Sequence, residues 1–146
     1  REGVPDVVVN CAGAGRWLML DEATVEEIKT GFDAPLLASA HLCHAMMPAM
    51  LRKGAGAIVN IQSPGGITSW GGSTAYQSSR WALHGLTLAL RNDCRESAIQ
   101  IQEVVLPEVE SGYWDNNPGS RQRLPWITAV FGVPTISSAK AAVFVA

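Results

Sequence analysis

Three short apolar runs, 7–9, 57–61 and 99–106, constrain the fold of this chain more than any other feature. Each run is too short for a buried helix and is rich in β-branched residues, which favours a strand. We expect the run 7–9 to be buried on both faces, as in a parallel sheet. Long segments with helical patterns separate the runs. Strands that alternate with helices predict an α/β fold with a parallel sheet.

A capping box predicts where the first helix begins. Thr24 is followed three residues later by Glu27, so each is placed to satisfy a free backbone N–H of the other. We expect Gly31 and Pro35 to interrupt this helix, and the apolar segment 34–51 to continue as a second, longer helix.

Two further helices are expected. The helix 74–97 carries apolar residues around more than one face, which predicts wide burial. Ser137 and Ser138 are suited to cap a last short helix. For the residues 142–146 a strand is the alternative interpretation.

The segment 34–51 contains no acidic residue, lysine or arginine over 18 residues, which is the lower limit for a membrane span. It also holds His41, His44 and two prolines. We therefore favour a helix packed between the sheet and a partner helix over a membrane span. The two histidines are interpreted as a packed or interface pair, because a metal site needs further ligands in register.

Composition narrows the function classes. The 146 residues fit one domain, and 47% hydrophobic with 16% charged residues favours a well-buried core. A net charge of −2 gives no reason to expect nucleic acid or an anionic membrane as a partner. Three cysteines without CxxC spacing are typical of reduced thiols in a cytoplasmic protein.

The region 107–136 is rich in Pro, Gly, Asn and Ser and has no clear period, so we expect a substrate-binding loop within a single domain 1–146. Tyr113, Trp114 and Trp126 lie in it. They either line a hydrophobic substrate pocket or pack as ordinary loop residues.

The candidate chemistry lies between Ser63 and Arg80. Ser63 ends the second strand and a glycine-rich loop follows. Tyr76 and Arg80 are spaced i and i+4, which places them on one helix face. A hydroxyl, a phenol and a fixed cation around one pocket suit proton transfer to or from an alcohol or carbonyl oxygen. The alternatives are a serine that satisfies loop backbone, a core tyrosine and a solvated arginine.

Three segments resemble the short-chain dehydrogenase/reductase family, whose members are Rossmann-fold oxidoreductases. Residues 10–13 resemble its Asn-Asn-Ala-Gly segment. Residues 58–63 resemble its serine-bearing strand, and residues 76–80 resemble its Tyr-x-x-x-Lys motif. Ser63 stands 13 residues ahead of Tyr76, as in the family. The resemblance covers the central and C-terminal part, from about residue 7 to 132.

The resemblance implies a doubly wound, three-layer Rossmann-like sheet and hydride transfer between NAD or NADP and a small alcohol or carbonyl substrate. It implies that Tyr76 is the general acid/base, that Ser63 binds the substrate oxygen and that Arg80 stands for the lysine. It also implies a set of cofactor-binding residues: Asn10, Ala12, Gly13, Tyr76, Arg80, Pro107 and Ser111. In the family, two long helices pair across a two-fold axis, so a homodimer through 34–51 and 74–97 is expected.

The sequence departs from the family in several places. Arginine keeps the charge of the lysine but has a planar fork and a different reach. Gly31 stands where many members carry a catalytic asparagine, and Glu108 replaces a glycine beside the nicotinamide. The family's glycine-rich phosphate turn should precede residue 1. We therefore interpret the chain as a fragment of a longer reductase. The alternative is a non-catalytic relic that acts as an interaction module.

Overall fold

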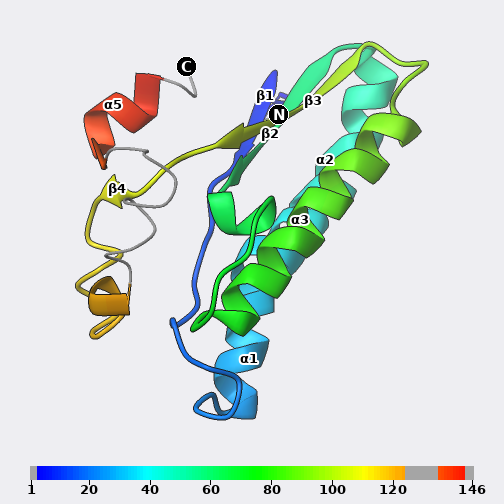
Figure 1. Ribbon diagram of the computed structural model, residues 1–146. Helices are drawn as coiled ribbons and strands as arrows, with labels where there is room; N and C mark the ends of the chain where they lie inside the picture. The colour runs from blue at the N-terminus through cyan, green and yellow to red at the C-terminus, as the bar shows by residue number, and fades with distance from the viewer. Residues whose placement is uncertain (1–2, 124–134, 144–146) are drawn as a thin grey trace.

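The computed structural model describes residues 3–123 and 135–143. Its centre is a sheet of three parallel strands in the order β1 (Val7–Asn10), β2 (Gly56–Gln62) and β3 (Ile99–Val105) (Figure 1). In the register of this sheet, Val8 lies beside Ile58, and Ile58 beside Ile101. The three apolar runs are therefore the strands that the sequence predicts, and the α/β class with a parallel sheet is confirmed.

The capping box forms as predicted. The N–H of Glu27 donates to Thr24 Oγ1 at 3.2 Å, and the N–H of Thr24 donates to Glu27 Oε2 at 2.9 Å. It begins α1 (Val25–Phe32).

The expected interruption of the first α-helix near Pro35 is confirmed, but it is a π-helical turn and not a break in the helical chain. A π-helical turn, Asp33–Leu37, joins α1 directly to α2 (Ala38–Lys53). In this turn the N–H of Ala38 donates to the carbonyl of Asp33, five residues earlier. The wider turn contains Pro35, which has no N–H to donate, so the chain stays helical through the proline.

Two long helices, α2 and α3 (Thr74–Asp93), lie against the same face of the sheet. The short helix η2 (Pro64–Gly66) connects β2 to the loop before α3. The apolar core fills the space between this sheet face and the two helices, and its fully or nearly buried members are Val8, Cys43, Met50, Ile58, Cys94, Ile99 and Ile101. Thus helices α1 to α3 supply one of the helical layers that the predicted architecture contains.

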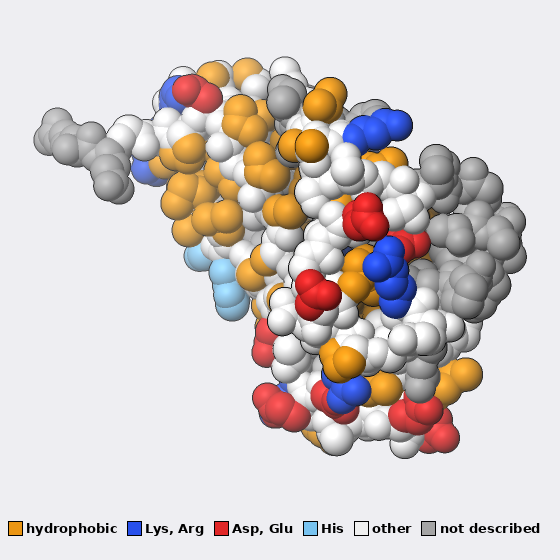
Figure 2. Space-filling model, turned by 90° about the vertical axis from the view of Figure 1, so that its left-hand side faces the viewer, with side chains coloured by type: hydrophobic (Ala, Val, Ile, Leu, Met, Phe, Trp, Pro, Cys, Tyr) orange, Lys and Arg blue, Asp and Glu red, His pale blue; other side chains and the backbone are white. Residues whose placement is uncertain are grey.

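The opposite sheet face is open at β1. The side chains of Val7 and Val9 are 54% and 43% exposed, so the expectation of a strand buried on both faces was wrong. Side chains alternate between the two faces of a strand, and the described helices α2 and α3 cover only the face of Val8. Figure 2 shows hydrophobic side chains gathered over the upper part of the molecular surface in that view.

The long helices are also less buried than expected. Trp81 and Leu88 of α3 are 46% and 43% exposed. Among the described residues, Val25–Lys53 is the one helix that has the length and apolar composition to cross a membrane, and 22% of its most apolar stretch is buried. Wide burial of this segment was therefore a wrong expectation, because most of its side chains stay partly exposed although it contacts both the sheet and α3.

The C-terminal region contains a second, two-stranded parallel sheet that the sequence did not predict. It pairs β4 (Val109–Glu110) with β5 (Ile136–Ser137), and the short helix η3 (Arg121–Arg123) lies between them in the chain. The last helix, α5 (Ser138–Val143), confirms the short helix expected after Ser137 as far as Val143, and residues 144–146 lie outside the described residues. Ser137 Oγ caps it by accepting from the N–H of Lys140 at 3.2 Å. Trp126 lies outside the described residues.

A chain of buried polar side chains crosses the core. Asn10 Nδ2 donates to Asn60 Oδ1 at 2.7 Å, and Asn60 Nδ2 donates to Thr87 Oγ1 at 2.8 Å. The Thr87 hydroxyl donates to the carbonyl of Leu83 at 2.9 Å. This chain of hydrogen bonds links β1, β2 and α3 at the depth where the strands approach their carboxyl ends.

Candidate active site

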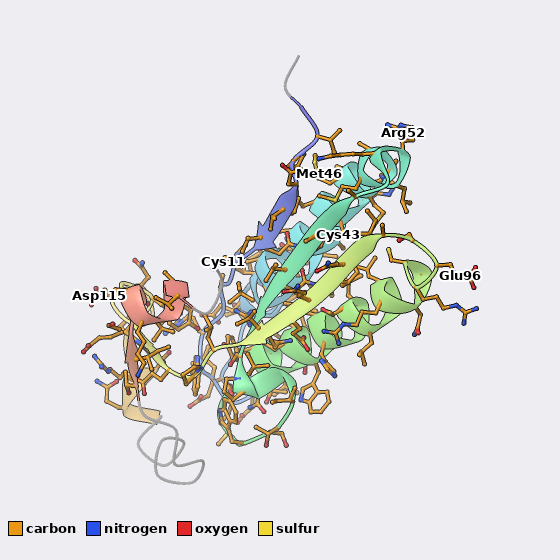
Figure 3. All side chains as sticks on the ribbon, turned by 90° about the horizontal axis from the view of Figure 1, so that it is seen from above. Cys11, Cys43, Met46, Arg52, Glu96 and Asp115 are labelled. Carbon is orange, nitrogen blue, oxygen red and sulfur yellow. The ribbon has the colours of Figure 1, made fainter. Side chains whose placement is uncertain are left out.

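A pocket of about 790 Å³ lies beyond the carboxyl ends of the three parallel strands. Open α/β sheets bind ligands at this edge. The residues that follow each strand line it, together with α3 and the region after β3. Cys11, directly after β1, lies on the side of the sheet that faces α5 (Figure 3). The fold therefore brings the segments that carry the candidate chemistry to one cavity.

Ser63 lies where β2 ends and is half-buried at the pocket wall. Its Oγ accepts from the N–H of Gly65 at 3.2 Å, which caps η2. The serine therefore does satisfy loop backbone, as one interpretation of the sequence holds. The same contact fixes the oxygen at the pocket wall and uses one of its acceptor sites, so the hydroxyl hydrogen stays available as a donor.

Tyr76 and Arg80 are brought together on the first turns of α3. Their side chains are 7% and 8% exposed, and the guanidinium carbon lies 5.3 Å from the centre of the phenol ring. Arg80 is therefore not a solvated surface cation. A guanidinium this close to an aromatic ring is attracted to its face, and burial strengthens its effect on neighbouring charge.

Arg80 also contacts the end of β2. Its Nη1 donates to the carbonyl of Ile61 at 3.0 Å. Its Nε is buried and has no hydrogen-bond acceptor among the described residues. A buried donor without an acceptor costs free energy unless a ligand or water satisfies it, so this atom marks the pocket as a place for a polar ligand group.

Gln62 is a site residue that the sequence reasoning missed. Its side-chain Nε2 donates to the carbonyl of Arg80 at 2.8 Å, and its Oε1 accepts from the N–H of Ser63 at 2.9 Å. Nε2 also lies 3.3 Å from Glu103 Oε1, and His84 Nδ1 lies 2.8 Å from Glu103 Oε2. One amide thus fixes the strand end and the helix relative to each other. A polar residue at the end of an apolar strand was the available signal.

An aromatic cluster surrounds one side of Tyr76. Trp17 is 6% exposed, and its ring centre lies 5.5 Å from that of Tyr76, 5.6 Å from Trp70 and 6.0 Å from Trp114. Tyr113 meets Trp114 edge to face at 5.1 Å. Tyr113 and Trp114 line the pocket as one interpretation of the sequence holds, whereas Trp17 and Trp70 were missed because they come from separate loops.

The hydroxyl of Tyr113 holds this cluster together. It accepts from Trp17 Nε1 at 3.2 Å and donates to the carbonyl of Gly15 at 3.0 Å. Burial raises the pKa of Tyr113 to about 12, with a smaller contribution from the neighbouring Tyr76. The phenol of Tyr113 is therefore neutral at physiological pH and acts as a hydrogen-bonding group.

The other predicted site residues lie in different places. Gly13, Pro107 and Ser111 line the pocket, as does Glu108. Asn10 is buried on the helix-covered face, where its amide pairs with Asn60, and Ala12 is exposed outside the pocket lining. The roles expected of these residues toward a cofactor stay predictions.

The three cysteines differ in environment. Cys11 is exposed at the pocket, whereas Cys43 and Cys94 are buried in the core. Burial raises the pKa of both core thiols, which lowers their reactivity. The pocket thiol is therefore the accessible one.

A family model described as short chain dehydrogenase matches residues 3–121. The 3-ketodihydrosphingosine reductase of Bacteroides thetaiotaomicron is 30% identical over 116 residues, which cover 80% of this chain and 43% of that protein. The chain spans about half the length of the curated relatives it matches.

Solved structures agree with this match. A short-chain dehydrogenase from Streptomyces avermitilis is 32% identical, with a TM-score of 0.63 over 72% of this chain and 37% of that one. A structure titled "ElxO with NADP Bound" is 26% identical, with a TM-score of 0.69 over 72% of this chain and 43% of that one. Since the family model extends from residue 3 to residue 121 of 146, the chain belongs to the short chain dehydrogenase family.

Proposed function

We propose that the protein carrying this chain is an NAD(P)-dependent oxidoreductase that interconverts an alcohol and a carbonyl compound. The observation that carries the proposal is the burial of Tyr76 and Arg80 against each other, in the pocket that Ser63 also lines. Family membership supports it, and so does the name of the Bacteroides relative, a reductase of a keto compound.

The residues present fit the nicotinamide end of such a cofactor. The buried Nε of Arg80 lacks an acceptor among the described residues, and a ribose hydroxyl is a suitable one. Gly13, Pro107 and Ser111 line the same pocket and would hold the cofactor beside Arg80. When bound, the nicotinamide would supply or accept the hydride.

Residues of this chain would donate and accept the proton. In reduction, the Tyr76 hydroxyl gives its proton to the carbonyl oxygen, and in oxidation the phenolate takes it back. The guanidinium of Arg80 holds a buried positive charge beside the Tyr76 ring while the proton moves. The Ser63 hydroxyl donates a hydrogen bond to the same oxygen and holds it near Tyr76.

The test is the Tyr76→Phe variant, which keeps the ring and its aromatic contacts but loses the proton. Turnover of NAD(P)H with carbonyl substrates should fall by a factor of about 10²–10⁴, while cofactor affinity changes little. Ser78→Ala is the matched control, because it removes an exposed hydroxyl from the same helix. Turnover by Tyr76→Phe at the native rate would contradict the proposal.

Cofactor binding has a readout that does not depend on turnover. Iodoacetamide should label Cys11 in preference to the two buried thiols. Because Cys11 lines the pocket, NADH or NADPH should slow this reaction, which peptide mass spectrometry follows. Unchanged labelling at saturating concentrations of both cofactors would contradict the proposed site.

We also propose that the protein forms a homodimer through α2 and α3. Their exposed apolar residues support this, and they are Leu42, Leu51, Trp81 and Leu88, each between 39% and 48% exposed. Sedimentation analysis should give a dimer, and Leu88→Glu should dissociate it. Val25→Glu, at an exposed position of α1, should leave it intact. A monomer at all concentrations would contradict this proposal.

A further inference from the structure

Four aromatic side chains line the pocket beside Tyr76, and they are Trp17, Trp70, Tyr113 and Trp114. They come from three loops far apart in the sequence. Trp17 contacts Trp70, Tyr76 and Trp114 at ring-centre distances of 5.5–6.0 Å, within the range of favourable aromatic pairs. The rings therefore form a continuous wall next to the proposed proton donor.

The hydrogen-bonding atoms of this wall are largely engaged within the protein. Trp17 Nε1 donates to the Tyr113 hydroxyl, which itself donates to the carbonyl of Gly15. Trp114 Nε1 donates to the carbonyl of Val109 at 3.0 Å. Tyr113 is neutral because burial raises its pKa to about 12. Trp17, Tyr113 and Trp114 therefore present carbon to a ligand, and a polar ligand group placed against them would lose its hydration without gaining a partner.

The charges around the pocket disfavour an anionic ligand. Arg80 is the one cation among the described lining residues, and its Nη1 is engaged with the Ile61 carbonyl. Glu108 also lines the pocket, and its side chain is 12% exposed. The nearest cation to that carboxylate is the exposed Arg121, at 3.7 Å. A ligand carboxylate would meet the negative charge of Glu108 at this site.

We propose that the substrate of this pocket is an uncharged ketone or aldehyde, or the corresponding alcohol, with a large apolar substituent beside the reacting carbon. This substrate class rests on the oxidoreductase function proposed above. The carbonyl oxygen lies toward Ser63 and Tyr76, and the apolar substituent lies along Trp17, Trp70 and Trp114. Keto acids and sugars are excluded because their polar groups find no partners along the ring wall.

The experiment compares uncharged methyl ketones from butanone to octanone with keto acids of the same chain lengths. The value of kcat/KM should rise with ketone length by about fourfold for each methylene that the wall buries. Each keto acid should be at least about tenfold poorer than its matched ketone. Keto acids used as well as the ketones would overturn the inference.

Trp114→Ala removes one ring of the wall. It should raise KM for octanone by about tenfold or more and leave KM for butanone nearly unchanged. Trp114→Phe keeps an aromatic ring and should retain the preference for long ketones even though its hydrogen bond to Val109 is lost. Leu20→Ala is the control, since it removes a large apolar side chain that is 58% exposed and does not line this pocket. Equal loss for butanone and octanone in Trp114→Ala would overturn the inference.

Ligand-observed NMR separates this inference from the proposed function, because it detects binding without turnover. One outcome is that octanone binds, the matched keto acid does not bind and no ketone is reduced. This outcome would support the apolar binding pocket and contradict the proposed oxidoreductase function. If ketones are reduced with no dependence on chain length, then the function stands and the substrate class fails.

Discussion

The guanidinium of Arg80 occupies the space that a side chain at position 13 would need. A Cβ built on Gly13 would lie 2.5 Å from Arg80 Nη2, closer than two such atoms can approach. Gly13 follows β1 and Arg80 belongs to α3, so this close approach joins two walls of the pocket. The absence of a side chain at Gly13 is what allows an arginine to be buried beside Tyr76.

Gly13→Ala should therefore displace Arg80. We expect a loss of about 1–3 kcal/mol in the free energy of unfolding, as for other overpacked sites, and a higher KM for the nicotinamide cofactor. Urea unfolding and initial rates measure the two effects. Gly85→Ala is the control, since a Cβ there meets nothing within 4 Å in the middle of α3. It should stabilise the protein by about 0.5–1 kcal/mol. Equal effects of the two alanines would contradict this account.

Gln62→Glu should uncouple the strand end from the helix. The carboxylate cannot donate to the Arg80 carbonyl, and it faces Glu103, whose Oε1 lies 3.3 Å from Nε2 of the native amide. Thermal unfolding should show a loss of about 1–3 kcal/mol, because a buried carboxylate would face the oxygens of Arg80 and Glu103 with no proton to donate, and kcat should fall as Ser63 shifts. The exposed Gln102→Glu should stay within about 0.5 kcal/mol of the native protein. Native stability of Gln62→Glu would refute the bridging role.

Glu27 should make the stability depend on pH. The backbone N–H of Thr24, then its hydroxyl and Arg16, lower the pKa of Glu27 below its ordinary value of 4.5. A lowered folded-state pKa stabilises the protein above pH 4.5, and this contribution is lost as the pH falls through the folded value. Glu27→Gln should thus have a lower Tm than the native protein at neutral pH, with the difference vanishing in acid. Glu26→Gln, at a position 80% exposed, should show little difference at any pH.

Ionisation of Tyr113 should make the stability depend on pH only in alkali. Its pKa is raised to about 12 from the ordinary 10.0, so the folded protein favours the neutral phenol. The stabilisation of the folded protein by the raised pKa of Tyr113 is complete below pH 10. It is lost between pH 10 and 12, because the tyrosine ionises first in the unfolded chain. Denaturant unfolding across this range should show a steeper decline for the native protein than for Tyr113→Phe. Phenolate absorbance of Tyr113 rising near pH 10 in the folded protein would contradict this.

The elements that the sequence predicted correctly depend on local geometry. A capping box needs only Thr24 and Glu27, and the i, i+4 spacing places Tyr76 and Arg80 on one helix face whatever surrounds them. The expectations about burial were less accurate. An apolar run such as 7–9 is compatible with a strand that is buried on one face or on both faces. Which of the two occurs depends on the elements that pack on the sheet.

The missed site residues depend on tertiary contacts. Trp17 and Trp70 meet across separate loops, and no spacing in the sequence relates them. The amide of Gln62 acts on Arg80 only because the strand end and the helix are neighbours in space. The π-helical turn around Pro35 was missed for another reason. Proline usually ends a helix, and here the wider turn needs no N–H from it.

The buried amides of Asn10 and Asn60 have a consequence for how the chain reaches its native sheet. Every position of Val7-Val8-Val9 is apolar, so a slip of β1 by two residues, about 7 Å, would keep a valine facing the helices. In the slipped sheet Asn10 would no longer lie beside Asn60, and each unpaired buried amide would cost about 1–3 kcal/mol. The pairing of the two amides therefore favours the native alignment of β1 during folding, in addition to the burial of Val8.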